Sequence, residues 1–149
     1  MPVPLLNEDI TKQIMELFDA QLEHPVEIIF FSKNDPCESC GITHQLLEEI
    51  ASITDKVHLR SFNLDENPQM AQHYKVDLAP GFVITEQDGE KSLDFGLHFS
   101  GIPSGYEFSA LVQGILLISK RDSGLKPEVR KELKNLTDPI NLKVFVTPT

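Results

Sequence analysis

Positive charge and long apolar runs are both scarce in this sequence. Thirteen Lys and Arg residues stand against 23 Asp and Glu residues among the 149, which gives a formal net charge of −10. Binding to a phosphate backbone rests on clustered cationic side chains, so this charge argues against a nucleic-acid-binding protein. No stretch approaches the ~20 apolar residues that cross a bilayer, and residues 1–9 lack the basic and apolar regions of a signal peptide. We therefore expect a cytoplasmic protein that binds neither nucleic acid nor membrane.

Cysteine is also scarce, and the two cysteines stand together in the segment Cys37-Glu38-Ser39-Cys40. An apolar segment typical of a buried strand, 26–31, precedes them, and apolar residues at helical spacing follow them. The first thiol then lies at a helix N-terminus, where free backbone N–H groups and the helix dipole favour the thiolate. The second lies three residues on, close enough to attack a mixed disulfide formed by the first. The pattern predicts a dithiol–disulfide exchange site in which Cys37 is the nucleophile and Cys40 the resolving cysteine.

Other interpretations of the cysteine pair stay open at this point. The two thiols could form an inert structural disulfide or lie buried as a thiol pair. With His44 they would make a partial zinc or iron–sulfur site, but structural zinc takes four protein ligands and the sequence offers no second C-x-x-C or H-x3-H to complete the set. We therefore predict no metal ligands. No cofactor is expected either, because the two sulfurs carry the reducing equivalents themselves.

Hydrophobic periodicity predicts an α/β domain over residues 1–119. Helical spacing of apolar residues, caps and turn signals define its helices, and short apolar or alternating runs define its strands. The expected helices are 8–23, 38–54 with Cys37 as its cap, 68–74 and 106–119. The expected strands are 26–31, 57–63, 82–85 and 93–97. We expect the first two strands to be parallel neighbours, and the last two to form a hairpin that turns at 86–89.

The charge changes sign near residue 120. Residues 1–119 carry 6 basic and 19 acidic side chains, a net charge of −13, whereas residues 120–149 carry 7 basic and 4 acidic ones, a net charge of +3. We predict a first unit at 1–119, a basic linker helix at 120–139, and at 140–149 the first strand of a truncated second unit. The last prediction rests on the similarity of Val144–Thr147 to Ile29–Ser32. An unpaired apolar strand would cause self-association or form a disordered tail.

Three features together resemble the thioredoxin fold: the element order, the C-x-x-C at the first strand–helix junction, and the proline of Ala79-Pro80-Gly81-Phe82 before the third strand. The additional N-terminal helix, the segment Asp65-Glu66-Asn67-Pro68 and the partial second unit are more specific. They resemble the glutaredoxin-like protein disulfide oxidoreductases of thermophilic bacteria and archaea, whose chains hold two thioredoxin units. The resemblance covers residues 7–149, and it implies a three-layer fold around a mixed sheet. It also implies that a second C-x-x-C would follow Thr149, so that the chain would be a fragment.

The resemblance carries several functional expectations. It implies exchange of protein disulfides through Cys37 and Cys40, with a reductase of the thioredoxin-reductase type as electron donor. It implies a cis peptide bond before Pro80, with Ala79 and Pro80 lining the edge where substrate docks. The alternative is a substrate-binding or structural module that assists a second, missing redox site.

Some residues depart from the thioredoxin pattern. No aromatic residue directly precedes Cys37, and Phe31 holds the place of a buried, proton-handling Asp, for which Glu27 is a weak substitute. Asp35 and Glu38 flank Cys37, and negative charge next to a thiol opposes formation of the thiolate. One hypothesis is therefore a mild or reducing couple rather than a strong oxidant. The alternative is that both acids are solvated and have little effect on the thiol.

Overall fold

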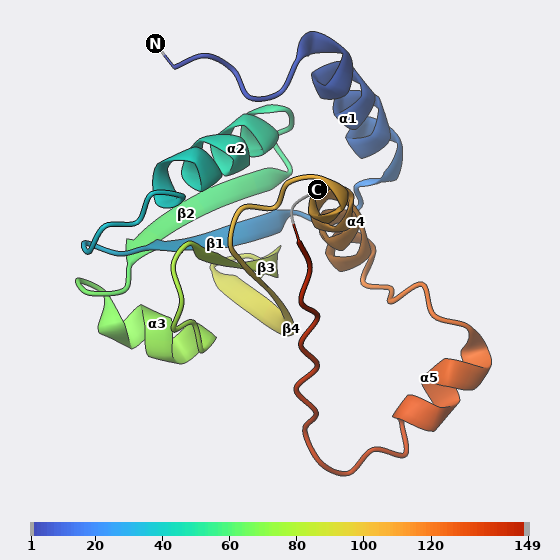
Figure 1. Ribbon diagram of the computed structural model, residues 1–149. Helices are drawn as coiled ribbons and strands as arrows, with labels where there is room; N and C mark the ends of the chain where they lie inside the picture. Colours follow the sequence, from blue (N-terminus) through green and yellow to red (C-terminus); the bar gives the residue numbers. More distant parts are fainter. Residues whose placement is uncertain (1, 148–149) are drawn as a thin grey trace.

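The strand that leads to the two cysteines lies inside a four-stranded sheet. The computed structural model describes residues 2–147, and in it β1 (Val26–Ser32) pairs in parallel with β2 (Val57–Asn63) and antiparallel with β3 (Gly81–Asp88). β3 in turn pairs antiparallel with β4 (Lys91–Ser100), so the strand order is β2-β1-β3-β4. This mixed sheet, with helices on both faces (Figure 1), confirms the predicted α/β class, the parallel neighbours and the antiparallel hairpin.

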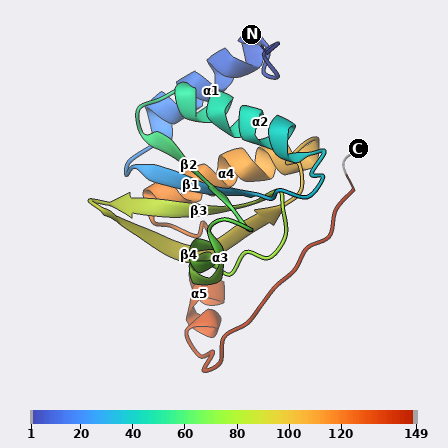
Figure 2. The same cartoon turned by 90° about the vertical axis from the view of Figure 1, so that its left-hand side faces the viewer.

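The two faces of the sheet are covered unequally (Figure 2). Three helices, α1 (Glu8–Gln21), α2 (Cys40–Ser52) and α4 (Tyr106–Lys120), pack on the face that carries Ile28 and Phe30. Only the short helix α3 (Pro68–Tyr74) packs on the face that carries Ile29 and Phe31. Successive residues of a strand point to opposite faces, so the uninterrupted apolar run of β1 supplies both cores.

The hairpin between β3 and β4 turns later than predicted. The turn lies at Gly89 and Glu90, with Asp88 paired to Lys91, so the prediction of a turn at 86–89 is wrong. Glu86 belongs to β3 and its side chain is only 1% exposed. In the partner strand the register shifts, because Ile84 pairs with Leu97 whereas Thr85 pairs with Asp94. Phe95 falls in this irregularity and is 59% exposed, instead of continuing the predicted alternation.

Between residues 121 and 147 every residue is exposed. The helix α5 (Pro127–Leu133) follows α4 after a short connection, and all of its side chains are exposed. From 134 to 147 the chain forms no strand and no regular helix. Figure 1 shows it running back toward α4. There Phe145 and Val146 line a shallow hollow together with Tyr106, the first residue of α4. Residues 148 and 149 of the predicted strand lie outside the described residues. A first strand of a second unit at 140–149 therefore stays a prediction. Within the described part of the chain, no helix is both long and apolar enough to cross a membrane.

Candidate functional site

The C-x-x-C segment lies where β1 passes into α2. Helix α2 begins at Cys40 and its N-cap is Ser39, so the prediction that Cys37 caps the helix is wrong. The backbone N–H of Cys40 donates to the carbonyl of Cys37 at 3.1 Å, which closes a turn ahead of the first helical residue. Cys37 is therefore one turn before the helix, in the loop, whereas Cys40 is part of the helix.

The two cysteines form a disulfide. Their Cα atoms lie 5.4 Å apart, a separation typical of disulfides. Cys40 is 9% exposed and belongs to the core between the helices and the sheet, whereas Cys37 is only half-buried at the edge of that core. A partner molecule approaching from solvent thus meets the sulfur of Cys37 first. This difference favours the predicted roles of Cys37 as nucleophile and Cys40 as resolving cysteine, which stay predictions.

The segment before β3 lies at the rim of the same core. Ala79 and Cys37 both pack against it, and the bond between Ala79 and Pro80 is cis, as the resemblance implied. Gly81 opens the strand directly afterwards, where a Cβ atom would lie 2.5 Å from the carbonyl oxygen of Leu78, so no larger residue fits there without a shift. The carbonyl of Pro80 accepts a bond from the N–H of Gly101 at 2.8 Å, which joins this segment to the loop before α4. Substrate binding by Ala79 and Pro80 stays a prediction.

His44 faces the neighbouring strand. Its Nε2 lies 2.9 Å from the hydroxyl of Ser61 on β2, its Nδ1 lies 3.5 Å from a carboxylate oxygen of Glu48, and its ring is 5.3 Å from that of Phe30. Among residues 2–147, no three His, Cys, Asp or Glu side chains gather as metal ligands would. The position of His44 is thus accounted for by its contacts with β1, β2 and its own helix.

Glu27 lies too far from the disulfide to exchange a proton with it directly. Its carboxylate accepts a bond from the hydroxyl of Ser92 at 2.7 Å and lies 3.2 Å from Nη2 of Arg60. Glu27 alternates with Ile28, so it points to the α3 face of the sheet, opposite the core that contains Cys40. Along β1 it is five residues before Ser32, a distance of about 17 Å at ~3.3 Å per residue. It does not replace the buried acid of the thioredoxin pattern.

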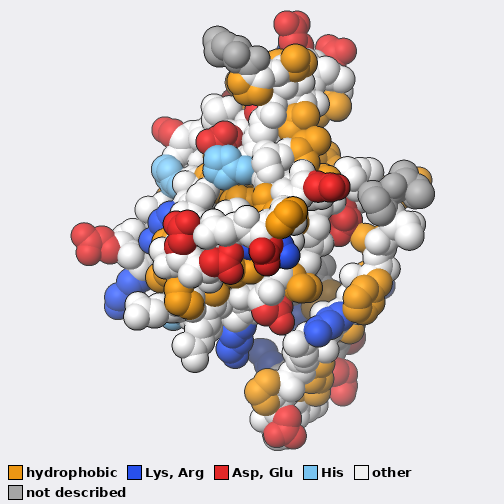
Figure 3. Space-filling view, turned by 60° about the vertical axis from the view of Figure 1, so that its left-hand side comes forward, with side chains coloured by type: hydrophobic (Ala, Val, Ile, Leu, Met, Phe, Trp, Pro, Cys, Tyr) orange, Lys and Arg blue, Asp and Glu red, His pale blue; other side chains and the backbone are white. Residues whose placement is uncertain are grey.

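Acidic side chains surround the loop that carries Cys37. Asp35 and Glu38 are exposed on that loop, and Asp65 and Glu66 are exposed on the connection between β2 and α3. Figure 3 brings this side of the molecule forward and shows several acidic side chains grouped near the middle of the face. Because these charges face water, screening weakens their effect on the Cys37 thiol. The mild or reducing couple therefore stays a prediction that only a measured potential tests.

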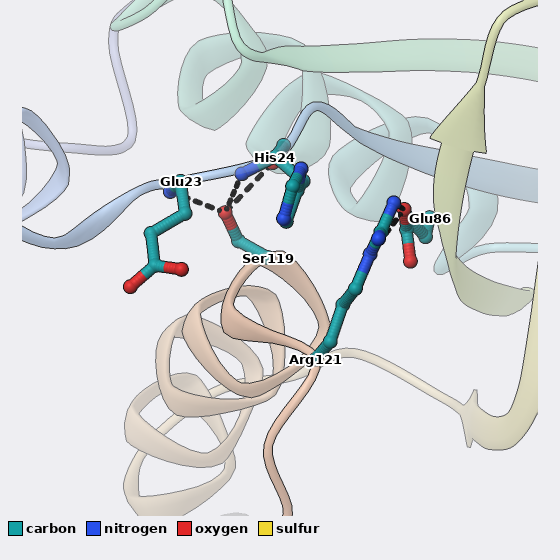
Figure 4. A network of polar contacts seen from close by, with 5 residues as sticks. All are labelled: Glu23, His24, Glu86, Ser119 and Arg121. Carbon is teal, nitrogen blue, oxygen red and sulfur yellow. Dashed lines mark hydrogen bonds and ion pairs between the residues drawn. The ribbon is translucent and has the colours of Figure 1, made fainter.

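A polar network anchors the far end of α4 (Figure 4), and no local sequence pattern indicated it. The buried hydroxyl of Ser119 accepts bonds from the N–H groups of Glu23 and His24 at 2.9 and 3.1 Å and donates to the carbonyl of His24 at 2.7 Å. Next to it, Nε of Arg121 donates to the buried carboxylate of Glu86 at 2.8 Å, and this bond raises the pKa of Arg121 above its ordinary value. The network fixes the helix whose other end follows the loop beside Pro80.

The comparisons with curated proteins identify one group of relatives. No family model matches the chain. Over 145 residues, 97% of the chain, it is 27% identical to the F subunit of alkyl hydroperoxide reductase of Staphylococcus epidermidis, and it is 27% identical over the same length to the protein of that name in Staphylococcus aureus strain Mu50. The chain spans 25% of the length of each of these two relatives. None of the sequence patterns described above pointed to this group.

Solved structures agree with the fold and with the resemblance. The chain is similar to the alkylhydroperoxide reductase F subunit of Enterococcus faecalis, with a TM-score of 0.76 and 26% identity over 88% of this chain and 61% of that one. It is also similar to a protein disulfide oxidoreductase from Aeropyrum pernix, with a TM-score of 0.74 and 26% identity over 90% of this chain and 56% of that one. The resemblance to a thioredoxin-fold unit of two-unit disulfide oxidoreductases is thereby confirmed. The C-x-x-C disulfide lies at the first strand–helix junction, as the resemblance implied.

Proposed function

We propose that this thioredoxin-fold chain is a thiol–disulfide oxidoreductase unit that passes two electrons between its Cys37–Cys40 pair and a disulfide of a partner protein. The observation that carries the proposal is the disulfide at the β1–α2 junction, with Cys37 half-buried at the edge of the core and Cys40 inside it. In the reduced chain, the Cys37 thiolate attacks one sulfur of the partner disulfide and forms a mixed disulfide, and the other partner sulfur leaves as a thiolate. Cys40 then loses its proton to solvent and attacks the Cys37 sulfur, which releases the second partner sulfur as a thiolate. The two partner thiolates take up protons from solvent, so that two electrons have moved from the chain to the partner.

The partners of such a unit are a reductase that returns electrons to Cys37–Cys40 and a protein disulfide that accepts them. The relatives among the F subunits of alkyl hydroperoxide reductase support an acceptor in hydroperoxide reduction, and the relative named protein disulfide oxidoreductase supports a broader range of protein disulfides. Both relationships support a redox relay. We place this relay in the cytoplasm, where reductants keep a dithiol available for exchange.

Reduction of insulin by dithiothreitol in the presence of the chain tests the proposal. The wild-type chain is expected to accelerate the reaction, and Cys37→Ser to abolish the acceleration because the attacking sulfur is gone. Cys40→Ser is expected to accumulate a mixed disulfide between Cys37 and insulin, visible after thiol trapping. The control Asp55→Ala, which removes an exposed acid from the α2–β2 connection, should behave as wild type. Activity that persists in Cys37→Ser would refute the proposal, and acceleration only by a longer protein with a second C-x-x-C would favour the assisting-module alternative.

The reduction potential of Cys37–Cys40 separates a redox couple from a structural disulfide. After equilibration in glutathione or dithiothreitol buffers, we expect rapid exchange and a potential of about −270 to −200 mV, the range of thioredoxins and glutaredoxins. A potential below about −300 mV with slow exchange would identify a structural disulfide. A value near about −120 mV would contradict the expected mild couple.

We also propose the division into a unit at 1–119, a linker at 120–139 and the beginning of a second unit at 140–149. The change of charge near residue 120 supports it, and so does the complete exposure of α5. Exposed apolar side chains of the tail, such as Val144 and Phe145 at 77% and 89%, would then lead to self-association. Sedimentation velocity should show a mass that rises with concentration for the full chain and stays monomeric for a chain that ends at Arg121. The same concentration dependence of the mass in both chains, or none in the full chain, would refute association through the tail.

A further inference from the structure

A closed ring of hydrogen bonds joins the loop of Cys37 to the loop that follows β2. The backbone N–H of Asn34 donates to Oδ2 of Asp65 at 2.7 Å, and Nδ2 of Asn63 donates to Oδ1 of Asn34 at 2.8 Å. The backbone N–H of Asp65 donates to Oδ1 of Asn63 at 2.9 Å, so that each of the three residues bonds to the other two. We refer to this arrangement as the Asn34–Asn63–Asp65 ring. The two loops that it joins lie side by side at the left of Figure 1.

One side of the ring rests on the sheet. Asn63 is the last residue of β2 and pairs with Ser32 at the end of β1. Its backbone N–H donates to Oδ1 of Asn67 at 3.0 Å, and the N–H of Leu64 donates to the carbonyl of Ser32 at 2.8 Å. On the other side, Asn34 is exposed and lies three residues before Cys37. The ring thus ties an exposed part of the redox loop to a fixed part of the fold.

The oxidised and reduced forms depend on the ring to different degrees. In the oxidised form, the disulfide itself holds Cys37 against Cys40. Once the disulfide is reduced, this covalent link is gone. The contacts described above that still hold the loop are the ring and the turn between the Cys37 carbonyl and the Cys40 N–H, at 3.1 Å. Loss of the ring would therefore free the loop of the dithiol far more than the loop of the disulfide.

We propose that Asp65 and Asn63 are positioning residues for Cys37, which hold the loop of the reduced chain in the conformation of the disulfide. Holding two reacting groups in place raises the effective concentration of one toward the other. In the equilibrium with dithiothreitol, the dithiol chain gives two electrons and two protons to oxidised dithiothreitol, and the Cys37–Cys40 bond forms. A higher effective concentration of the thiols favours this bond, so the ring lowers the reduction potential of the pair. The proposal deepens the proposed function and rests on its redox pair, but it concerns an equilibrium that needs no protein substrate.

The test measures this equilibrium in variants of the full chain. Asp65→Ala removes the acceptor of the Asn34 N–H, a charge-assisted bond, and is expected to lower the equilibrium constant for disulfide formation by about tenfold, a rise in potential of about 30 mV. Asp65→Asn keeps an oxygen that accepts the same bond. Glu66→Ala removes the neighbouring exposed charge, and no hydrogen bond of that side chain is among those in the described structure. Both are expected to stay within about twofold of wild type, because the ring survives in them.

Two outcomes would overturn the proposal. The first is an unchanged equilibrium constant in Asp65→Ala. The second is an equal change in Asp65→Ala, Asp65→Asn and Glu66→Ala, because the cause would then be negative charge and not the hydrogen bond. If Asp65→Ala does not fold, Asn34→Ala decides, since it removes the Asn63 bond at an exposed position and should shift the constant in the same direction by a smaller factor.

Amide hydrogen exchange gives an independent readout of the ring. The Asn34 N–H should exchange faster in reduced Asp65→Ala than in the reduced wild type, and the difference should be smaller in the oxidised proteins. Equal exchange in the two reduced proteins would overturn the proposal. If Asp65→Ala changes the equilibrium constant but the wild-type chain does not accelerate insulin reduction, the positioning role stands and the proposed function is refuted. If the wild type accelerates insulin reduction but Asp65→Ala leaves the constant unchanged, the proposed function stands and the positioning role is refuted.

Discussion

Helices α1 and α5 both carry apolar side chains at helical spacing, and of these two only α1 buries them. In α1, Ile14 and Phe18 are 5% and 1% exposed, because the helix packs on the sheet beside α4. In α5, Val129 and Leu133 have the same spacing and are 43% and 48% exposed. An apolar stripe therefore indicates which side of a helix can be buried, but the side chains are buried only where another apolar surface packs against that side. The core of the described residues ends with α4.

Substitution of one residue in each stripe gives the sharpest test of this contrast. Phe18→Ala removes a buried aromatic ring and should lower the free energy of unfolding by about 3–5 kcal/mol. Leu133→Ala removes a side chain without core contacts and should change it by less than about 0.5 kcal/mol. Urea unfolding of both variants measures the difference. A large loss in Leu133→Ala would mean that α5 packs on a surface in solution.

The sequence predicted those features that depend on short-range patterns. The apolar run of β1, the C-x-x-C directly after it and the Asn67-Pro68 start of α3 are local signals, and each of these elements lies within a few residues of its predicted position. The misplaced hairpin turn has a long-range cause, because Glu86 is polar but accepts bonds from Arg121, 35 residues away. The site shows the same division. Cys37 and Cys40 are recognised from the C-x-x-C pattern, whereas the bond between Asn34 and Asp65 spans 31 residues and no local sequence pattern predicts it.

Ser119 marks the point where the packed part of the chain ends, and its removal should have a moderate effect. Ser119→Ala removes the hydroxyl that pairs with the N–H of Glu23 and the carbonyl of His24, whereas the N–H of His24 keeps its bond to the Ser119 carbonyl at 3.2 Å. The two lost bonds should lower the free energy of unfolding by about 1–2 kcal/mol. Ser109→Ala changes an exposed serine of the same helix and serves as the control, with an expected effect under about 0.5 kcal/mol. If the two variants unfold at the same urea concentration, the network of Figure 4 does not stabilise the fold.

The segment at Leu5 and Leu6 is held by hydrogen bonds, whereas the segment at Phe145 is exposed, which repeats the contrast between the two helices. The attachment of the first segment should depend on pH. The N–H groups of Leu5 and Leu6 donate to the carboxylate of Glu49 at 2.9 and 2.8 Å, whereas the side chain of Phe145 is 89% exposed. Burial raises the pKa of Glu49, but the bonds from Leu5, Leu6 and Gln45 outweigh it, so the pKa lies below its ordinary 4.5.

A carboxylate with a lowered pKa in the folded state stabilises that state fully above its unfolded pKa, and the contribution is lost as the pH falls through the folded value. The segment before α1 that contains Leu5 and Leu6, which we call the N-terminal arm, should therefore detach from Glu49 below pH 4.5 while the rest of the core stays folded. In NMR spectra, the amide resonances of Leu5 and Leu6 should shift with a midpoint below 4.5, and that of Phe145 should not follow them. Glu49→Gln should remove this titration, and Glu48→Gln, one residue away and exposed, should leave it intact. A titration that persists in Glu49→Gln would show that another group holds the arm, and the contrast between the two ends would then need a different cause.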